Sequence, residues 1–111
     1  MRLDELVRAL GLKVYCAEGN LGREVRGGYV GDLLSDVMAN SKEGDLWITR
    51  QVHQNIVAVA SLKELAGIVL IQGSEPAPDT AAKAGAEGIP VLVTDLPAFE
   101  IVGRIYKLIH P

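Results

Sequence analysis

After Gly44, the chain alternates three times between a short apolar run and a helical stretch. The apolar runs cover residues 46–49, 67–71 and 89–93, and the helical stretches cover residues 53–65, 80–86 and 97–109. The central run is apolar throughout, which is typical of a parallel strand covered on both faces. The alternation predicts an α/β fold in a single domain, with a mainly parallel sheet, right-handed βαβ crossovers and helices on both faces.

The first 45 residues give weaker signals. Residues 3–10 carry apolar side chains at helical spacing and predict an amphipathic helix that ends at Gly11. Residues 13–16 predict a short strand, and the glycine-dense stretch 27–31 predicts bulges or close backbone approach between short strands. Residues 33–38 fit a strand or a helical turn, and we predict a strand. No linker or repeat appears, so residues 1–111 are expected to form one domain.

Composition argues against several classes of partner. The net charge is −3 and aromatic residues make up only 5% of the chain, which disfavours binding to nucleic acid or to an anionic membrane. The N-terminus is acidic within a few residues and the apolar runs are too short to span a bilayer, so we expect a cytoplasmic protein. Cys16, the only cysteine, is expected to be a buried strand residue.

Polar side chains follow each of the three buried strands. Thr49, Arg50, His53 and Asn55 end the first strand and open the next helix. In open α/β sheets, ligands bind outside the carboxyl ends of the strands, and the loops after the second and third strands should lie nearby. The predicted ligand-binding residues are therefore Thr49, Arg50, His53, Asn55, Gln72, Gly73, Ser74, Thr94 and Asp95.

Two of these residues have more than one interpretation. His53 fits a proton carrier or an anion contact at a helix N-terminus, and it equally fits a histidine that hydrogen-bonds to its own loop. Arg50 fits a bidentate clamp on phosphate or carboxylate, or an exposed loop residue. Trp47 is interpreted as a core or dimer contact, and Asp32 and Asp36 as solvated or turn-capping carboxylates.

The residue types give no catalytic centre. One cysteine, two histidines and scattered carboxylates form neither a nucleophile-and-base set nor a metal site. No dinucleotide fingerprint or phosphate-binding loop occurs. We therefore predict no catalytic residues, no metal and no cofactor.

Residues 31–109 resemble the DRTGG domain family. The resemblance rests on the order of Asp36-Val37-Met38-Ala39, Gly44-Asp45-Leu46-Trp47-Ile48-Thr49, Asn55-Ile56-Val57-Ala58-Val59-Ala60, Ala66-Gly67-Ile68-Val69-Leu70-Ile71-Gln72-Gly73 and Gly88-Ile89-Pro90-Val91-Leu92-Val93. The family is similar in fold to the N-terminal domains of HPr kinase/phosphorylase and of Mur ligases. It also occurs as a module in some phosphotransacetylases and CBS-domain pyrophosphatases, which implies a regulatory role and no kinase activity.

The chain departs from the motif that names this family. Val52 and His53 stand where an Asp-Arg pair is expected, with Arg50 nearby. Gln72-Gly73-Ser74 stands where Thr-Gly-Gly is expected, so one glycine is retained. The resemblance therefore does not fix which ligand this chain would hold.

Three functions remain open at this stage. The favoured prediction is a non-catalytic regulatory or ligand-sensing module. It is expected to form a homodimer and to bind a small anionic metabolite or nucleotide, a partner enzyme, or both. The alternative is a ligand-free interaction or dimerisation domain that uses residues 97–109 and 27–31. The third is a small phosphoryl- or acyl-transfer enzyme that uses His53 and Arg50.

Overall fold

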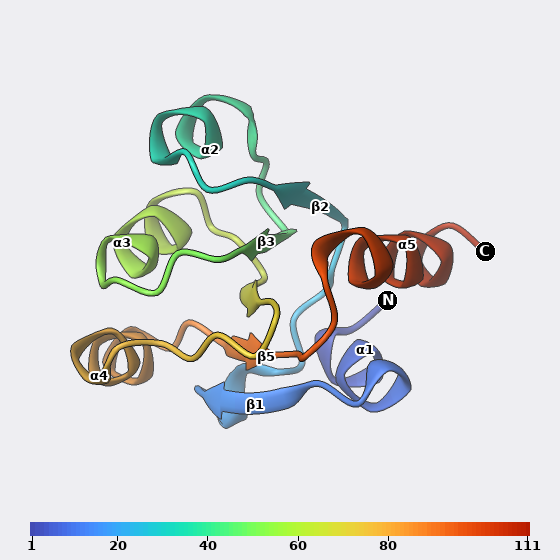
Figure 1. Ribbon diagram of the computed structural model, residues 1–111, viewed down its shortest axis with the longest axis horizontal. Coiled ribbons are helices and arrows are strands. Elements are labelled where there is room, and N and C mark those ends of the chain that lie inside the picture. Colours follow the sequence, from blue (N-terminus) through green and yellow to red (C-terminus); the bar gives the residue numbers. More distant parts are fainter.

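A five-stranded sheet with helices on both faces organises the chain (Figure 1). The computed structural model describes residues 1–111. In chain order the elements are α1 (Leu3–Leu10), β1 (Lys13–Cys16), the 3₁₀ turn η1 (Glu18–Asn20), β2 (Gly27–Val30), α2 (Leu34–Asn40), β3 (Asp45–Thr49), α3 (Asn55–Leu62), β4 (Gly67–Leu70), α4 (Pro78–Glu87), β5 (Val91–Val93) and α5 (Ala98–Ile109).

The strand order is β1-β5-β4-β3-β2, and four of the five strands are parallel. Strands β2 to β5 lie side by side in chain order, each joined to the next by a helix. β1 alone runs antiparallel, pairing with β5 from Lys13 opposite Val93. The predicted α/β class, with a mainly parallel sheet and βαβ crossovers, is confirmed.

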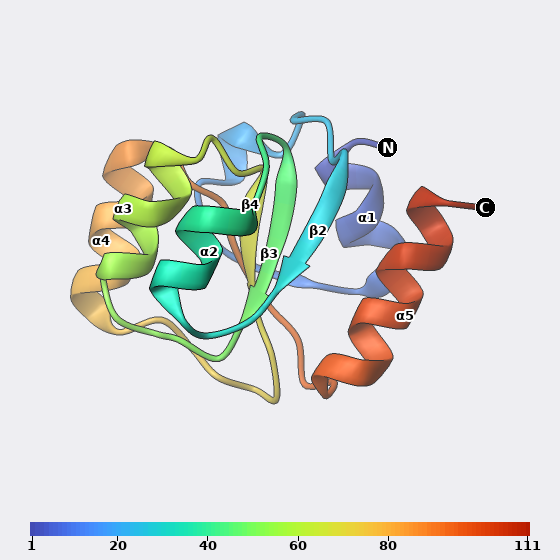
Figure 2. The ribbon, with the colours of Figure 1, turned by 90° about the horizontal axis from the view of Figure 1, so that it is seen from above.

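The helices divide between the two faces of the sheet. α2, α3 and α4 cover one face, and α1 and α5 cover the other (Figures 1 and 2). Right-handed crossovers between successive neighbouring strands place all the linking helices on one side, which explains the first group. Side chains that alternate along each strand supply both cores, so Trp47 faces α2 to α4 while Leu46 and Ile48 face α1 and α5.

The strand predicted over residues 33–38 is wrong. The structure has helix α2 there, beginning at Leu34 and ending at Asn40. Only Val37 is fully buried in this helix, while Leu34 and Met38 pack at the margin of the core. These three positions fall at i, i+3 and i+4, which is the spacing of one face of a helix. This spacing explains why the segment is a helix although its short apolar run also fits a strand.

The other predicted elements differ mainly at their ends. Gly11 ends α1 in the left-handed region, as expected, with a φ of 63°, and Gly88 ends α4 in the same way with a φ of 70°. Helix α4 begins at Pro78, two residues before the predicted helical stretch 80–86. Cys16 is buried in β1, as predicted, and burial raises the pKa of its thiol.

Candidate functional site

The loops that follow β3, β4 and β5 are joined to one another at the carboxyl edge of the sheet. The Gly73 N–H donates to the Thr94 carbonyl at 2.9 Å, which joins the second loop to the third. The Ala77 N–H and the Thr80 hydroxyl both donate to the Val52 carbonyl, at 3.0 and 2.8 Å, which joins the first loop to the second. The structure thus brings together the loops that carry the predicted ligand-binding residues.

Two of the predicted residues use their side chains for hydrogen bonds within the protein. Thr49 and Thr94 are buried, and the Thr94 hydroxyl accepts the Leu96 N–H at 3.2 Å. The Thr49 hydroxyl accepts the Gln51 N–H at 3.2 Å and donates to the Asp32 carboxylate at 2.7 Å. These hydroxyls set the course of the chain as it leaves each strand.

Asp32 is part of this edge, and the sequence indicated it only as a solvated or turn-capping carboxylate. Its Oδ1 accepts both the Thr49 hydroxyl and the Arg50 N–H, the latter at 2.8 Å. The backbone N–H of Arg50, followed by the Thr49 hydroxyl, lowers the pKa of the Asp32 carboxyl below its ordinary value. Asp32 therefore holds the β2–α2 loop against the end of β3, and it places a negative charge beside Arg50.

The remaining polar groups of the carboxyl edge face solvent. Arg50, His53, Asn55, Gln72 and Asp95 are exposed, and Gly73 and Ser74 lie between them in the second loop. The side chains of Arg50 and His53 make no ion pair or hydrogen bond within the chain. The Arg50 guanidinium and the His53 imidazole therefore remain available to a ligand.

The start of α3 adds unpaired donors at the same place. The backbone N–H groups of His53, Gln54 and Asn55 donate to no acceptor in the protein. N–H groups at a helix start carry partial positive charge and favour anions. Asp32 and Asp95 oppose this, so the edge holds charges of both signs.

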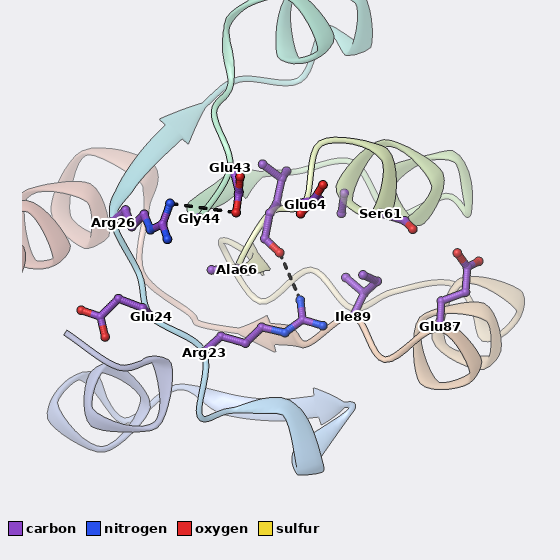
Figure 3. Close-up of a pocket in the computed structure, with 12 residues that line it drawn as sticks. Arg23, Glu24, Arg26, Glu43, Gly44, Ser61, Glu64, Ala66, Glu87 and Ile89 are labelled. Atoms are coloured by element: carbon purple, nitrogen blue, oxygen red, sulfur yellow. Dashed lines mark hydrogen bonds and ion pairs between the residues drawn. The ribbon is translucent and has the colours of Figure 1, made fainter.

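A separate cavity lies at the opposite, amino edge of the sheet (Figure 3). Its volume is about 440 Å³, and Arg23, Arg26, Glu43 and Glu64 are among its lining side chains. Glu24 and Glu87 also line it, so carboxylates outnumber guanidinium groups. Sequence reasoning did not find this cavity, because its walls come from segments far apart in the chain.

The Arg23 guanidinium in this cavity already donates hydrogen bonds to the protein backbone. Its guanidinium donates to the Leu65 carbonyl at 3.1 Å and to the Gly88 carbonyl at 2.8 Å. Figure 3 shows its side chain reaching from the segment before β2 toward the start of β4. Because the Arg23 guanidinium is already hydrogen-bonded and four carboxylates line the cavity, the amino edge is poorly suited to an anionic ligand.

Comparison with protein families identifies the chain. The model of the DRTGG domain matches residues 5–108. The chain belongs to the DRTGG domain family. A search of curated proteins found no match.

A solved structure shares the fold of this DRTGG domain. It is described as the CBS and DRTGG domains of the regulatory region of Clostridium perfringens pyrophosphatase, complexed with the activator diadenosine tetraphosphate. The match has a TM-score of 0.66 and 19% sequence identity, and it covers 91% of this chain and 46% of that one. This DRTGG domain thus spans about half the length of that regulatory region.

The two segments where the family's motif was expected, residues 52–53 and 72–74, lie at the carboxyl edge. Val52 uses its backbone carbonyl to join two loops, while His53 projects from the start of α3 among exposed residues. Gly73 keeps a left-handed φ of 71°, and a Cβ there would lie 3.3 Å from a carboxylate oxygen of Asp95. None of the helices combines the length and the apolar character that a membrane span requires.

Proposed function

We propose that this DRTGG domain is a non-catalytic, cytoplasmic regulatory module that binds a small anionic metabolite or nucleotide at the carboxyl edge. Arg50 and His53 supply the side-chain contacts, and the unpaired N–H groups at the start of α3 supply further hydrogen bonds. Thr49, Asn55, Gln72, Gly73, Ser74, Thr94 and Asp95 shape the surrounding loops. The module acts as a homodimer and conveys the bound state to a partner enzyme.

The observation that carries this proposal is the set of available donors in one short segment. Arg50 and His53 have no partner within the chain, and three consecutive N–H groups at the start of α3 are also unpaired. Anions prefer such an arrangement, because the helix dipole and the Arg50 guanidinium act in the same direction. The similar regulatory region, which was solved with a nucleotide activator, supports the same class of ligand.

A second candidate function is a protein-interaction or dimerisation domain without a ligand. The observation in its favour is the exposure of large apolar side chains on α5, where Phe99 is 93% and Tyr106 is 65% exposed. Exposed apolar groups that gather in one place mark interaction surfaces.

A thermal-unfolding screen separates the two candidates. Nucleotides, dinucleoside polyphosphates, acyl phosphates and small anions are added to the wild-type chain. A ligand at a hundredfold its dissociation constant stabilises the fold by about 2.7 kcal/mol, which raises Tm by roughly 10 °C for a domain of this size. Arg50→Ala and His53→Ala are expected to abolish the shift.

The matched control is Arg8→Ala, which removes an exposed arginine from α1 and should leave the ligand shift unchanged. A shift that survives both Arg50→Ala and His53→Ala would move the site away from the carboxyl edge. If no compound in the library raises Tm, the result would favour the interaction domain.

A further inference from the structure

One edge of the sheet remains open at β2. The Arg26 N–H donates to the Gly44 carbonyl next to β3 at 2.9 Å, whereas the Val25 N–H donates outward to the Met1 carbonyl at 2.8 Å. Backbone groups alternate between the two sides of a strand, so the N–H and C=O groups of Gly27 and Tyr29 face outward. Met1 reaches no further than Val25. We call the outward side of residues 27–30 the β2 edge.

The β2 edge lacks two of the features that usually keep an edge strand unpaired, a bulge and a charged side chain. β1, at the other end of the sheet, is interrupted by a register shift between Val14 and Cys16, and it carries the charged side chain of Lys13. β2 pairs with β3 in unbroken register and has no charged residue from Gly27 to Val30. Bulges and charges protect sheet edges from further pairing, so β2 is the edge that can accept another strand.

An exposed apolar stripe on α5 lies beside this edge. We define the α5 stripe as Phe99, Val102, Gly103 and Tyr106, which line one groove together with Val30. Phe99 is 93%, Tyr106 65% and Val30 48% exposed. Gly103 is exposed inside the helix, and no atom lies within 4 Å of where its Cβ would be. Glycine destabilises a helix interior, and nothing within this chain requires its small size.

We propose that a second copy of this chain pairs antiparallel with the β2 edge across a two-fold axis, so that the two α5 stripes pack together. This proposal rests on the proposed function, which includes a homodimer, and it identifies the surfaces through which the two copies would bind. Two sheets would join into one, and the unpaired groups of Gly27 and Tyr29 would find partners. A two-fold interface uses the same patch on both copies, as a strand edge paired with itself does.

The position of α5 agrees with this arrangement. A two-fold axis perpendicular to the sheet keeps both α5 helices on the same face, and each packs on β2 and β3. With neighbouring strands about 4.8 Å apart, helices centred over β2 and β3 in each copy would have axes roughly 10 Å apart. Packed helices have interaxial distances of about 8–10 Å. A glycine at the middle of the stripe permits the closest approach.

Charges favour a second copy in the antiparallel sense. A strand pair centred on Gly28 places Gly27 of one copy opposite Tyr29 of the other, which pairs the outward groups of both residues and brings no like charges together. A helix pair centred on Gly103 brings Lys107 of one copy toward Glu100 of the other. A parallel arrangement of the two copies would place like charges together. The charges of one copy therefore complement those of the other only when the copies are antiparallel.

The test measures the oligomeric state by light scattering and sedimentation over a range of protein concentrations. The wild type is expected to dimerise. Phe99→Glu and Tyr106→Glu are each expected to weaken the dimer at least about thirtyfold, which is the effect of losing an interface anchor. Leu62→Glu is the matched control, because Leu62 is 70% exposed on α3 and should not alter dimerisation.

A cross-linking measurement keeps the test decisive if a charged variant folds poorly. Gly103→Cys adds a thiol close to the two-fold axis in open space, so mild oxidation is expected to give a disulfide-linked dimer. Leu62→Cys should remain uncross-linked under the same conditions. Cys16 is buried and should not contribute.

A wild type that stays monomeric at high concentration would overturn the proposal, as would a dimer that Phe99→Glu and Tyr106→Glu leave intact. A monomer that pairs through β2 with an unrelated strand would also overturn it. Binding at the carboxyl edge is a separate result: a monomer whose thermal shift still depends on Arg50 and His53 would refute this interface and leave the ligand site standing.

Discussion

At the residue scale, Asp32 has a larger structural role than its sequence context indicates. It bridges the end of β3 and the β2–α2 loop through the Thr49 hydroxyl and the Arg50 N–H. Thr49 is 2% exposed, so its hydroxyl would have few alternatives if this acceptor were removed. The carboxylate thus fixes the backbone from which Arg50 projects.

We expect Asp32→Ala to lower the free energy of unfolding by about 1–2 kcal/mol at pH 7, because a buried hydroxyl loses its acceptor. Urea denaturation measures the change. Glu18→Ala, which removes an exposed carboxylate in η1, is the control and should change stability by less than about 0.5 kcal/mol. Equal losses in the two variants would contradict the role assigned to Asp32.

The same carboxylate predicts a pH dependence. The pKa of Asp32 in the folded chain lies below its ordinary value of 3.8. The unfolded chain therefore binds the proton more readily, so the stabilisation from Asp32 is present above the ordinary pKa and is lost as pH falls through the folded pKa. Denaturation from pH 6 down to pH 2.5 should show a smaller acid-side loss for Asp32→Asn than for the wild type. Parallel curves would exclude this contribution.

The individual site residues could be predicted only in part. Position after a strand was enough to bring Arg50, His53 and Gln72 to one edge, because parallel strands share that edge. The use of the Thr49 and Thr94 hydroxyls within their own loops could not be read from the sequence, because it depends on local backbone direction. The structural role of Arg23 could not be predicted, because its acceptors, the Leu65 and Gly88 carbonyls, lie 42 and 65 residues away in the sequence.

At the scale of elements, α2 shows why short amphipathic segments are ambiguous. Its apolar residues fit a strand of five or six residues as well as two helical turns, and no capping side chain marks its start. The later strands and helices were predictable because each apolar run is long enough and is separated from the next by a helical stretch. The parallel direction of β3, β4 and β5 followed from the helical stretches between them, but the strand order and the antiparallel direction of β1 did not.

Two glycines near the end of α4 should respond oppositely to substitution. Gly85 is helical with open space at its Cβ position, so Gly85→Ala should raise the free energy of unfolding by up to about 1 kcal/mol. Gly88 has a φ of 70°, so Gly88→Ala should lower it by about 1 kcal/mol or more. Thermal unfolding of both variants provides the comparison, and a shift of the same sign in both would show that backbone conformation is not the cause.

At the scale of the whole molecule, Arg23 joins parts of the fold that the sheet alone does not join. Its guanidinium connects the segment before β2 to the turns that precede β4 and β5. We expect Arg23→Met to lower the free energy of unfolding by about 2 kcal/mol, because two charge-assisted hydrogen bonds are lost while the aliphatic stem is kept.

Arg23→Lys tests whether geometry or charge is responsible for that effect. A lysine ammonium cannot reproduce the planar fork that reaches two carbonyls, so it should recover less than half of the loss. Chemical denaturation of the two variants alongside Arg8→Ala gives the measurement. Full recovery by lysine would show that charge alone is sufficient.

The pairing of β1 with β5 has a consequence for synthesis on the ribosome. Lys13 pairs with Val93, so the first strand to emerge must wait for a partner made 80 residues later. At about 5–20 residues per second, that delay is roughly 4–16 s. Strands β2 to β5 can assemble in the order in which they leave the exit tunnel, whereas β1 remains unpaired until the last of them appears. β1 is therefore the strand of this sheet that stays accessible to chaperones and proteases for longest during translation.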